Sequence, residues 1–250
     1  MSLGDGGPSC RNPVRQVARV RGRFRVQDEH GDIGHRRSLA SGRPILARRV
    51  RTYIGLGANI GDPAATIAAG VHALAALPGV RLRGVSKLYA TVPVGVADQP
   101  EFRNAAVALD VPAAGEPTGG ALALLVALKQ LERAFGRRDR ERWGPRELDL
   151  DLLVFGRHRI DVDRPPDARS SDPTKPTDLV VPHRLAGERL FVLAPLADLA
   201  PRLVPPGWHE TVESARRRRE RIEGPDAVHP IATWDFERST WSPLAASQPR

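Results

Sequence analysis

Cysteine is nearly absent from this sequence: among its 250 residues only Cys10 carries a thiol. A single thiol cannot form an internal disulfide, and it excludes a zinc site built from several cysteines. A reducing, cytoplasmic setting is therefore expected. The sequence also lacks an apolar run long enough to span a bilayer, and it shows no apolar segment near its start of the kind that marks a secretory signal. With 41% hydrophobic residues, the chain can form one sizeable domain with a buried core.

Positive charge is gathered at one end of the chain. The net charge is +9, and residues 1–51 alone contain twelve arginines and four acidic residues, so the remainder is nearly neutral. This segment has few large apolar side chains and no sustained period, so we predict that 1–51 is a disordered, Arg-rich extension. One alternative function is a nucleic-acid-binding protein that uses this tail. The scarcity of aromatic residues among the arginines disfavours it.

Hydrophobic periods predict one domain over 52–207, with elements in the order β-α-β-β-α-β. This order predicts an α+β fold, a ferredoxin-like sandwich in which helices pack on an antiparallel sheet. The proline- and charge-rich segment 161–178 is expected to be an exposed inserted loop. The polar C-terminal extension, 208–250, is expected to be largely disordered. The predicted strands are 52–57, 80–90, 102–111 and the one that holds Asp149 and Asp151. One predicted helix begins after Asp62, and two others span about 119–135 and 187–199.

The most informative segment is the run GPRELDLDLLVF at 144–155. Its residues alternate with the period of a β-strand, so Asp149 and Asp151 point to the same side. Two adjacent carboxylates repel each other and are costly to desolvate, whereas Mg²⁺ takes oxygen ligands and needs few carboxylates when a phosphate supplies the rest. The arginine-rich stretch from Arg137 to Arg146 suits a polyphosphate. It therefore disfavours the alternative, an edge strand with two solvated aspartates.

A second candidate site lies on the predicted strand 102–111. Phe102 and Asn104 share a strand face whose other positions are alanine. A flat heterocycle has room there, and the Asn104 amide offers both a hydrogen-bond donor and an acceptor. Considered alone, Phe102 fits an ordinary core aromatic better. Asn104 two residues later and the loop before the strand favour the binding role instead.

Four motifs in a fixed order resemble one enzyme family over about residues 53–207. They are YIGLGANIGD at 53–62, TVPVGVADQPEFRNAAVAL at 91–109, RWGPRELDLDLL at 142–153, and VPH at 181–183 with ER at 188–189. Together they resemble 6-hydroxymethyl-7,8-dihydropterin pyrophosphokinase. The resemblance implies transfer of a pyrophosphoryl group from the co-substrate ATP to the hydroxymethyl group of a reduced pterin, with two Mg²⁺ ions and AMP as the leaving product. GLGANIG fits neither GxGxxG nor GxxxxGK[ST], so it is assigned no phosphate role.

The resemblance also implies roles for individual residues. Asp149 and Asp151 match the metal-binding aspartates of the family. For two of these residues a simpler alternative exists: Glu132 could be a glutamate on the helix surface, and His183 could be a structural histidine. The implied pterin contacts are Thr91, Val92, Val94, Phe102, Asn104 and Phe191; the implied ATP contacts are Glu132, Arg137, Arg146, His183 and Arg189; and the implied catalytic residues are Arg137, Arg146 and Trp143.

Two positions depart from the family pattern. Asp139 stands where the family has an arginine, and Arg184 stands where it has proline or tyrosine. We expect a monomer or weak dimer that acts on small molecules, with no membrane and no specific nucleic-acid partner. A further alternative is an inactive homologue that serves as a scaffold. The joint presence of the two aspartates with Arg146 and Asn104 argues against such decay.

Overall fold

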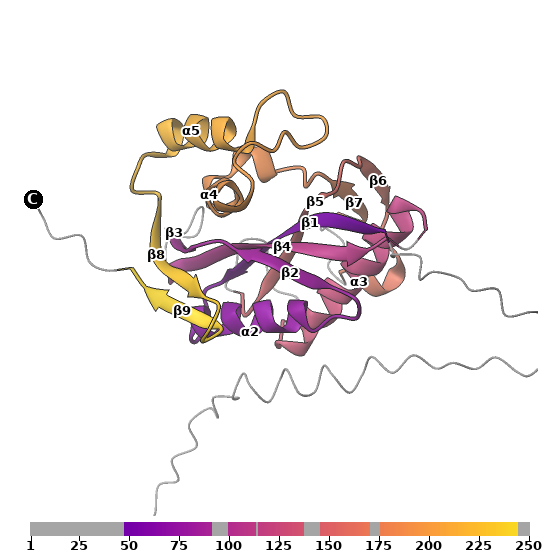
Figure 1. The fold of residues 1–250 in the computed structure, drawn as a ribbon, viewed down its shortest axis with the longest axis horizontal. Coiled ribbons are helices and arrows are strands. Elements are labelled where there is room, and N and C mark those ends of the chain that lie inside the picture. Colours follow the sequence, from indigo (N-terminus) through magenta and orange to yellow (C-terminus); the bar gives the residue numbers. More distant parts are fainter. Residues whose placement is uncertain (1–47, 92–99, 114, 138–145, 171–175, 245–250) are drawn as a thin grey trace, which may run out of the picture.

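The computed structural model describes residues 48–91, 100–113, 115–137, 146–170 and 176–244. Within these ranges the chain forms a seven-stranded antiparallel sheet, with helices on both of its faces, and a separate two-stranded sheet (Figure 1). The strand order in the large sheet is β5-β1-β4-β3-β8-β9, and β2 also pairs with β4. The predicted ferredoxin-like α+β fold is confirmed, with the second predicted strand divided into β2 and β3.

The elements are as follows. The large sheet contains β1 (Arg49–Ala58), β2 (Arg81–Val85), β3 (Leu88–Thr91), β4 (Phe102–Pro112), β5 (Asp149–Phe155), β8 (Val228–Asp235) and β9 (Thr240–Pro243). The small sheet contains β6 (Ile160–Asp163) and β7 (Asp178–Val181). The helices are α2 (Pro63–Ala75), α3 (Pro117–Ala134), α4 (Leu190–Leu199) and α5 (Val212–Glu223), with short 3₁₀ turns η1 (Pro166–Ala168) and η2 (Ala186–Glu188).

Helix α2 begins where its capping residues predict. The Asp62 carboxylate accepts a hydrogen bond from the Ala65 backbone N–H at 3.0 Å, and Pro63 occupies the first helical position. Ile67 and Leu74 are fully buried on the face that packs against the sheet. None of the helices in the described ranges is both long and apolar enough to cross a membrane.

Strand β4 separates the two sides of the molecule. Ala105, Val107 and Leu109 point into the main core, which α2 and α3 cover. Ala108 points to the opposite face, where it joins a second cluster beneath α4 and α5. Figure 1 shows this arrangement, with α2 and α3 below the sheet and α4 and α5 above it. The predicted alternation of the two faces along β4 is therefore correct.

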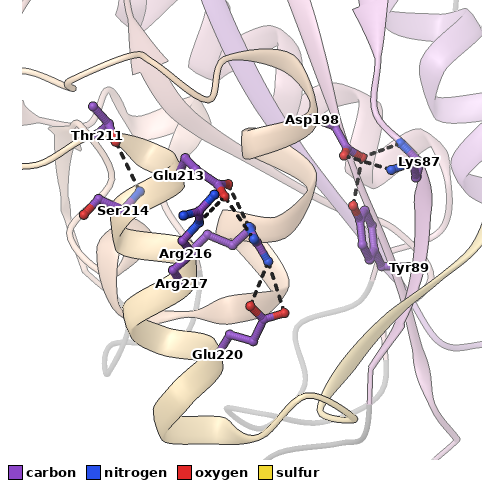
Figure 2. Close-up of polar contacts among 9 residues, drawn as sticks. All are labelled: Lys87, Tyr89, Asp198, Thr211, Glu213, Ser214, Arg216, Arg217 and Glu220. Carbon is purple, nitrogen blue, oxygen red and sulfur yellow. Dashed lines mark hydrogen bonds and ion pairs between the residues drawn. The ribbon is translucent and has the colours of Figure 1, made fainter.

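The C-terminal segment is the largest correction to the sequence-based prediction. Residues 212–243 were expected to be disordered, but they form α5, β8 and β9. Strand β8 pairs with the whole of β3, from Leu88 to Thr91. Charged side chains of helix α5 form ion pairs with one another; Arg216, for example, bonds to Glu213 and to Glu220 (Figure 2). Its composition thus reflects paired charges on an ordered helix.

Two predicted boundaries also differ from the structure. The segment 161–178 is not simply a loop, because β6 pairs with β7 and η1 lies between them; residues 171–175 are outside the described ranges. At the other end β1 starts at Arg49, so the ordered domain begins before the predicted boundary at 52. The rest of the predicted disordered extension, 1–47, is outside the described residues.

The hairpin of β8 and β9 should contribute measurably to stability through Trp241. Its indole Nε1–H donates to the Ala64 carbonyl at 3.1 Å, and its ring meets Trp234 edge-on at 4.8 Å. We expect Trp241→Ala to lower the free energy of unfolding by about 2 kcal/mol in urea titrations, less than for a fully buried tryptophan. Phe236→Ala, at a residue 61% exposed in the hairpin turn, is the control and should stay within about 0.5 kcal/mol of the parent. Equal effects of the two changes would contradict this assignment.

Candidate active site

Strand register brings the two sequence-predicted sites onto one face of the sheet. Asp149 on β5 lies opposite Gly57 on β1, and Gly57 lies opposite Asn104 on β4. Residues directly opposite each other in antiparallel strands point to the same face. The Asp149 carboxylate and the Asn104 amide are therefore on one face, with backbones two strand spacings, or about 10 Å, apart.

The strand between them presents glycines on this face. Gly55 and Gly57 are both partly exposed, and neither has a side chain to stand between β5 and β4. A Cβ atom at Gly57 would lie 3.1 Å from Asn104 Oδ1, so a larger residue would displace that amide. The neighbouring row runs from Asp151 through Gly55 to Ala106. A strip of short residues thus joins the carboxylate end of the face to the amide end.

Asp149 is paired with two arginines. Arg137 Nη1 bonds to one carboxylate oxygen and Arg146 Nη1 bonds to the other. Burial would raise the pKa of Asp149, but the positive charges of Arg137 and Arg146 outweigh it and hold that pKa well below its ordinary value. The carboxylate is therefore ionised at neutral pH, and two of the predicted phosphate-binding arginines are already in place beside it.

Glu132 on α3 supports this cluster from inside the protein. Its side chain is only 2% exposed, and Oε1 accepts from the Leu150 backbone N–H at 2.7 Å. The same oxygen lies 2.8 Å from Lys129 Nζ and 2.6 Å from Arg137 Nη1. Burial raises the pKa of Glu132, while the Lys129 and Arg137 charges oppose that rise. The interpretation of Glu132 as a helix-surface residue is therefore wrong.

Asn59, which the sequence analysis did not single out, joins two segments beside the site. Its Oδ1 accepts from the Arg146 backbone N–H at 2.7 Å, and its own backbone N–H donates to the Arg146 carbonyl at 3.1 Å. Its Nδ2 donates to the Pro100 carbonyl at 3.2 Å, and the residue is 2% exposed. Asn59 thus ties the segment before β5 to the segment before β4, and it gives the GLGANIG stretch a supporting role.

The amide end of the face is lined by polar and aromatic groups. Asn104 Nδ2 donates to Thr91 Oγ1 at 2.9 Å, and both side chains are buried. Phe102 lies opposite Thr91 in the pairing of β3 with β4 and is partly exposed. A hydroxyl, an amide and a ring are therefore adjacent here, as a site for a flat heterocycle requires.

Arg189 and Phe191 lie at the start of α4. Phe191 packs against a cluster that includes Tyr89, and Tyr89 is the strand partner of Asn104. The Arg189 guanidinium carbon lies 5.6 Å from the centroid of the Phe191 ring, within the range of a cation–π contact. The structure therefore places these two predicted residues together, one strand away from the amide end of the face.

His183 is attached to β5 through its backbone. Its N–H donates to the Leu153 carbonyl at 2.9 Å, while its Nδ1 accepts from the Leu185 N–H at 3.3 Å. In the neutral ring the proton is then on Nε2, which makes this nitrogen a donor suited to an anionic oxygen. The backbone tie gives His183 a structural role as well as this donor.

Some predicted residues cannot be placed. Trp143, Val92, Val94 and Asp139 are outside the described residues. Arg184, the other departure from the family pattern, forms an ion pair with Asp178. Among the described residues, no group of three or more His, Cys, Asp or Glu side chains is arranged to hold a metal ion. Asp149 and Asp151 offer carboxylate oxygens, the donor type that Mg²⁺ prefers.

Comparison with known proteins finds relatives that match more than half of this chain. The family model for 7,8-dihydro-6-hydroxymethylpterin-pyrophosphokinase matches residues 53–201. The 2-amino-4-hydroxy-6-hydroxymethyldihydropteridine pyrophosphokinase of Methylorubrum extorquens is 44% identical over 165 residues, which are 66% of this chain and 90% of the relative. The enzyme of the same name from Pseudomonas aeruginosa is 44% identical over 160 residues, or 64% of this chain and 86% of the relative.

Solved structures agree at the level of the fold. The crystal structure of wild-type Plasmodium falciparum HPPK-DHPS with pteroate superposes with a TM-score of 0.57 at 16% sequence identity, covering 79% of this chain. This chain spans about half of that one, 48%. Taken with the sequence matches, these findings show that the chain belongs to the 7,8-dihydro-6-hydroxymethylpterin-pyrophosphokinase family and is a pyrophosphokinase.

Proposed function

We propose that the sheet face bearing Asp149 and Asn104 is where the pyrophosphoryl group of ATP passes to the hydroxymethyl group of 6-hydroxymethyl-7,8-dihydropterin, with AMP as the second product. The observation that supports this most is the register of Asp149, Gly57 and Asn104 across three strands. This register places a charged end, suited to a polyphosphate, on the same face as a polar end that is lined by the Phe102 ring. The two ends are about 10 Å apart at the backbone, so one face accommodates both substrates.

The pterin is assigned to the amide end. Asn104 offers the complement of a pterin amide edge, and its contact with Thr91 fixes the amide in place. Phe102 from β4 and Phe191 from α4 are the rings between which the heterocycle would stack. Val92 and Val94, which follow Thr91 in the chain, are proposed to add backbone contacts.

The polyphosphate is assigned to the charged end. Arg137 and Arg146 are paired with Asp149, and their guanidinium groups can hold phosphate oxygens in a fixed geometry. Nε2 of His183 and the guanidinium of Arg189 are proposed as further ATP contacts, and Trp143 is proposed as a further catalytic residue. Glu132 is buried under Arg137, so we assign it the positioning of that arginine.

Asp149 and Asp151 are the residues proposed to hold magnesium, as two ions. They fit this role because they share a strand face, offer only oxygen atoms, and Asp149 is ionised. When bound, Mg²⁺ neutralises charge on the phosphate oxygens and favours attack at phosphorus. The residues of this chain then contribute by aligning the pterin hydroxyl with the β-phosphate and by excluding water. We also propose a monomer or weak dimer in the cytoplasm, with no specific nucleic-acid partner.

The direct test of the reaction is product analysis with the purified chain, ATP, Mg²⁺ and 6-hydroxymethyl-7,8-dihydropterin. We expect AMP and the pterin pyrophosphate to form in equal amounts, as measured by ion-exchange chromatography. AMP formation should stop when the pterin is left out. ADP as the nucleotide product, or AMP formed equally fast without pterin, would contradict the assignment.

Replacing the metal-binding carboxylates should abolish turnover. We expect Asp149→Asn and Asp151→Asn each to lower kcat by at least about a hundredfold, or about 3 kcal/mol of activation free energy, because a charged ligand is lost. The matched controls are Asp161→Asn and Asp163→Asn, since these exposed aspartates have the same spacing on β6.

The controls should keep the parent activity, and circular dichroism should show all four proteins folded. Turnover close to that of the parent in either Asp149→Asn or Asp151→Asn would remove that residue from the metal site.

A further inference from the structure

Helix α5 contacts the backbone on both sides of Arg189. Arg218 Nη2 donates to the Gly187 carbonyl at 3.1 Å, two residues before Arg189. Glu223 Oε1 accepts from the Leu190 N–H at 3.3 Å, one residue after it. Helix α5 lies beyond residues 53–201, the range that the family model matches. Two side chains from outside that range thus fix a short segment that bears a substrate-binding candidate.

Glu223 acts as a cap supplied by another helix. The first N–H groups of a helix have no partner within it, and Arg189 at the N-cap of α4 makes no side-chain capping bond. Glu223 accepts from the first of these N–H groups and places negative charge near the helix N-terminus, where the dipole favours it. Arg219 holds the Glu223 carboxylate with bonds of 3.0 and 2.7 Å.

The remainder of α5 is held in place independently of this contact. Thr211 Oγ1 accepts from the Ser214 N–H at 3.1 Å and caps the helix (Figure 2). Arg216 lies between Glu213 and Glu220, at 2.8 and 3.0 Å. The helix also buries Val212 and Ala215 in the second core cluster. The position of α5, and with it the positions of Arg218 and Glu223, is therefore fixed by contacts other than those with the Arg189 segment.

The strand that follows α5 reaches the same region. Val228 on β8 lies opposite Thr91 on β3, and it packs in the cluster against which Phe191 rests. At the far end of α4, Asp198 accepts from the Tyr89 hydroxyl at 2.9 Å, which attaches α4 to β3 (Figure 2). Both ends of α4 are therefore tied to neighbouring elements, its first turn by α5 and its last turn by β3.

We propose that α5 is a positioning element of the active site, in which Arg218 and Glu223 fix the backbone around Arg189 and so direct the Arg189 guanidinium and the Phe191 ring. This inference rests on the proposed function, because that function gives these two side chains to ATP and to the pterin. In this proposal Arg218 and Glu223 act through the backbone of Gly187 and Leu190 and not directly on a substrate. Their loss should therefore weaken the binding of both substrates more than it slows the chemical step.

The test compares neighbouring residues of one helix. Arg218→Ala and Glu223→Ala remove the two contacts with the Arg189 segment. The matched controls are Arg217→Ala and Glu220→Gln, because Arg217 pairs with Glu213 and Glu220 pairs with Arg216, all within α5. Steady-state kinetics give KM for ATP, KM for the pterin and kcat, and thermal unfolding gives Tm for each variant.

We expect Arg218→Ala and Glu223→Ala each to raise both KM values about fivefold, the loss from one net hydrogen bond, with kcat changed less than about twofold. The controls should match the parent. Glu223→Gln keeps an acceptor for the Leu190 N–H and should recover part of the loss. KM values in Arg218→Ala and Glu223→Ala equal to those of the controls would overturn the proposal. So would a rise in KM that the control variants show to the same extent, with the same fall in Tm, because the effect would then be general destabilisation.

Two further measurements cover the cases in which a variant does not fold or the unmodified chain is inactive. If Glu223→Ala does not fold, Glu223→Gln and Arg218→Ala form the test, and parent-like KM values in both overturn the proposal. If the unmodified chain releases no AMP, the proposed function fails on its own. The dissociation constant of a non-hydrolysable ATP analogue, measured by calorimetry on the same variants, then decides whether α5 positions Arg189.

Discussion

The arrangement of the charged end of the candidate site depends on one buried carboxylate, that of Glu132. A buried charge is tolerated only when it is paired and hydrogen-bonded, and Lys129 and Arg137 provide the pairing. The same oxygen accepts from the backbone of Leu150, the residue between the two candidate metal ligands. Because these bonds meet at one atom, α3, the start of β5 and the arginine beside Asp149 are fixed relative to one another. The direction of the carboxylates on β5 follows from this constraint.

The same arrangement recurs around the face. Arg146, beside the carboxylates, is held through its backbone by Asn59, and the first turn of α4 is held by Glu223. In each case a candidate substrate-binding residue comes from a loop or a helix end, and a polar group from a different element fixes its backbone. Groups held in this way lose less freedom when a substrate binds, which favours both affinity and alignment. The glycines of β1 complete the face, since neither places a side chain between β5 and β4.

Sequence patterns predicted the parts of this architecture that have a local period. The alternation along β5 placed both aspartates on one face, and β4 alternated as expected. The pairing of β8 with β3 has no local signature, since it joins segments far apart in the chain. Helix α5 did have a signal, the opposite charges of Arg219 and Glu223 four residues apart. Glu132 also had one, because it follows Leu128 by four residues on the apolar stripe of α3, but its partner Leu150 could only be found in three dimensions.

The central claim is that Glu132 is a paired, buried charge on which this end of the site depends. Its most direct test is the free energy of unfolding of Glu132→Gln, measured by urea denaturation beside Glu101→Gln, whose side chain is 46% exposed in a surface ion pair. The account predicts a loss of about 3 kcal/mol or more for Glu132→Gln, because Arg137 and Lys129 lose their buried counter-charge, and less than about 0.5 kcal/mol for the control. A change within about 0.5 kcal/mol in Glu132→Gln would contradict it.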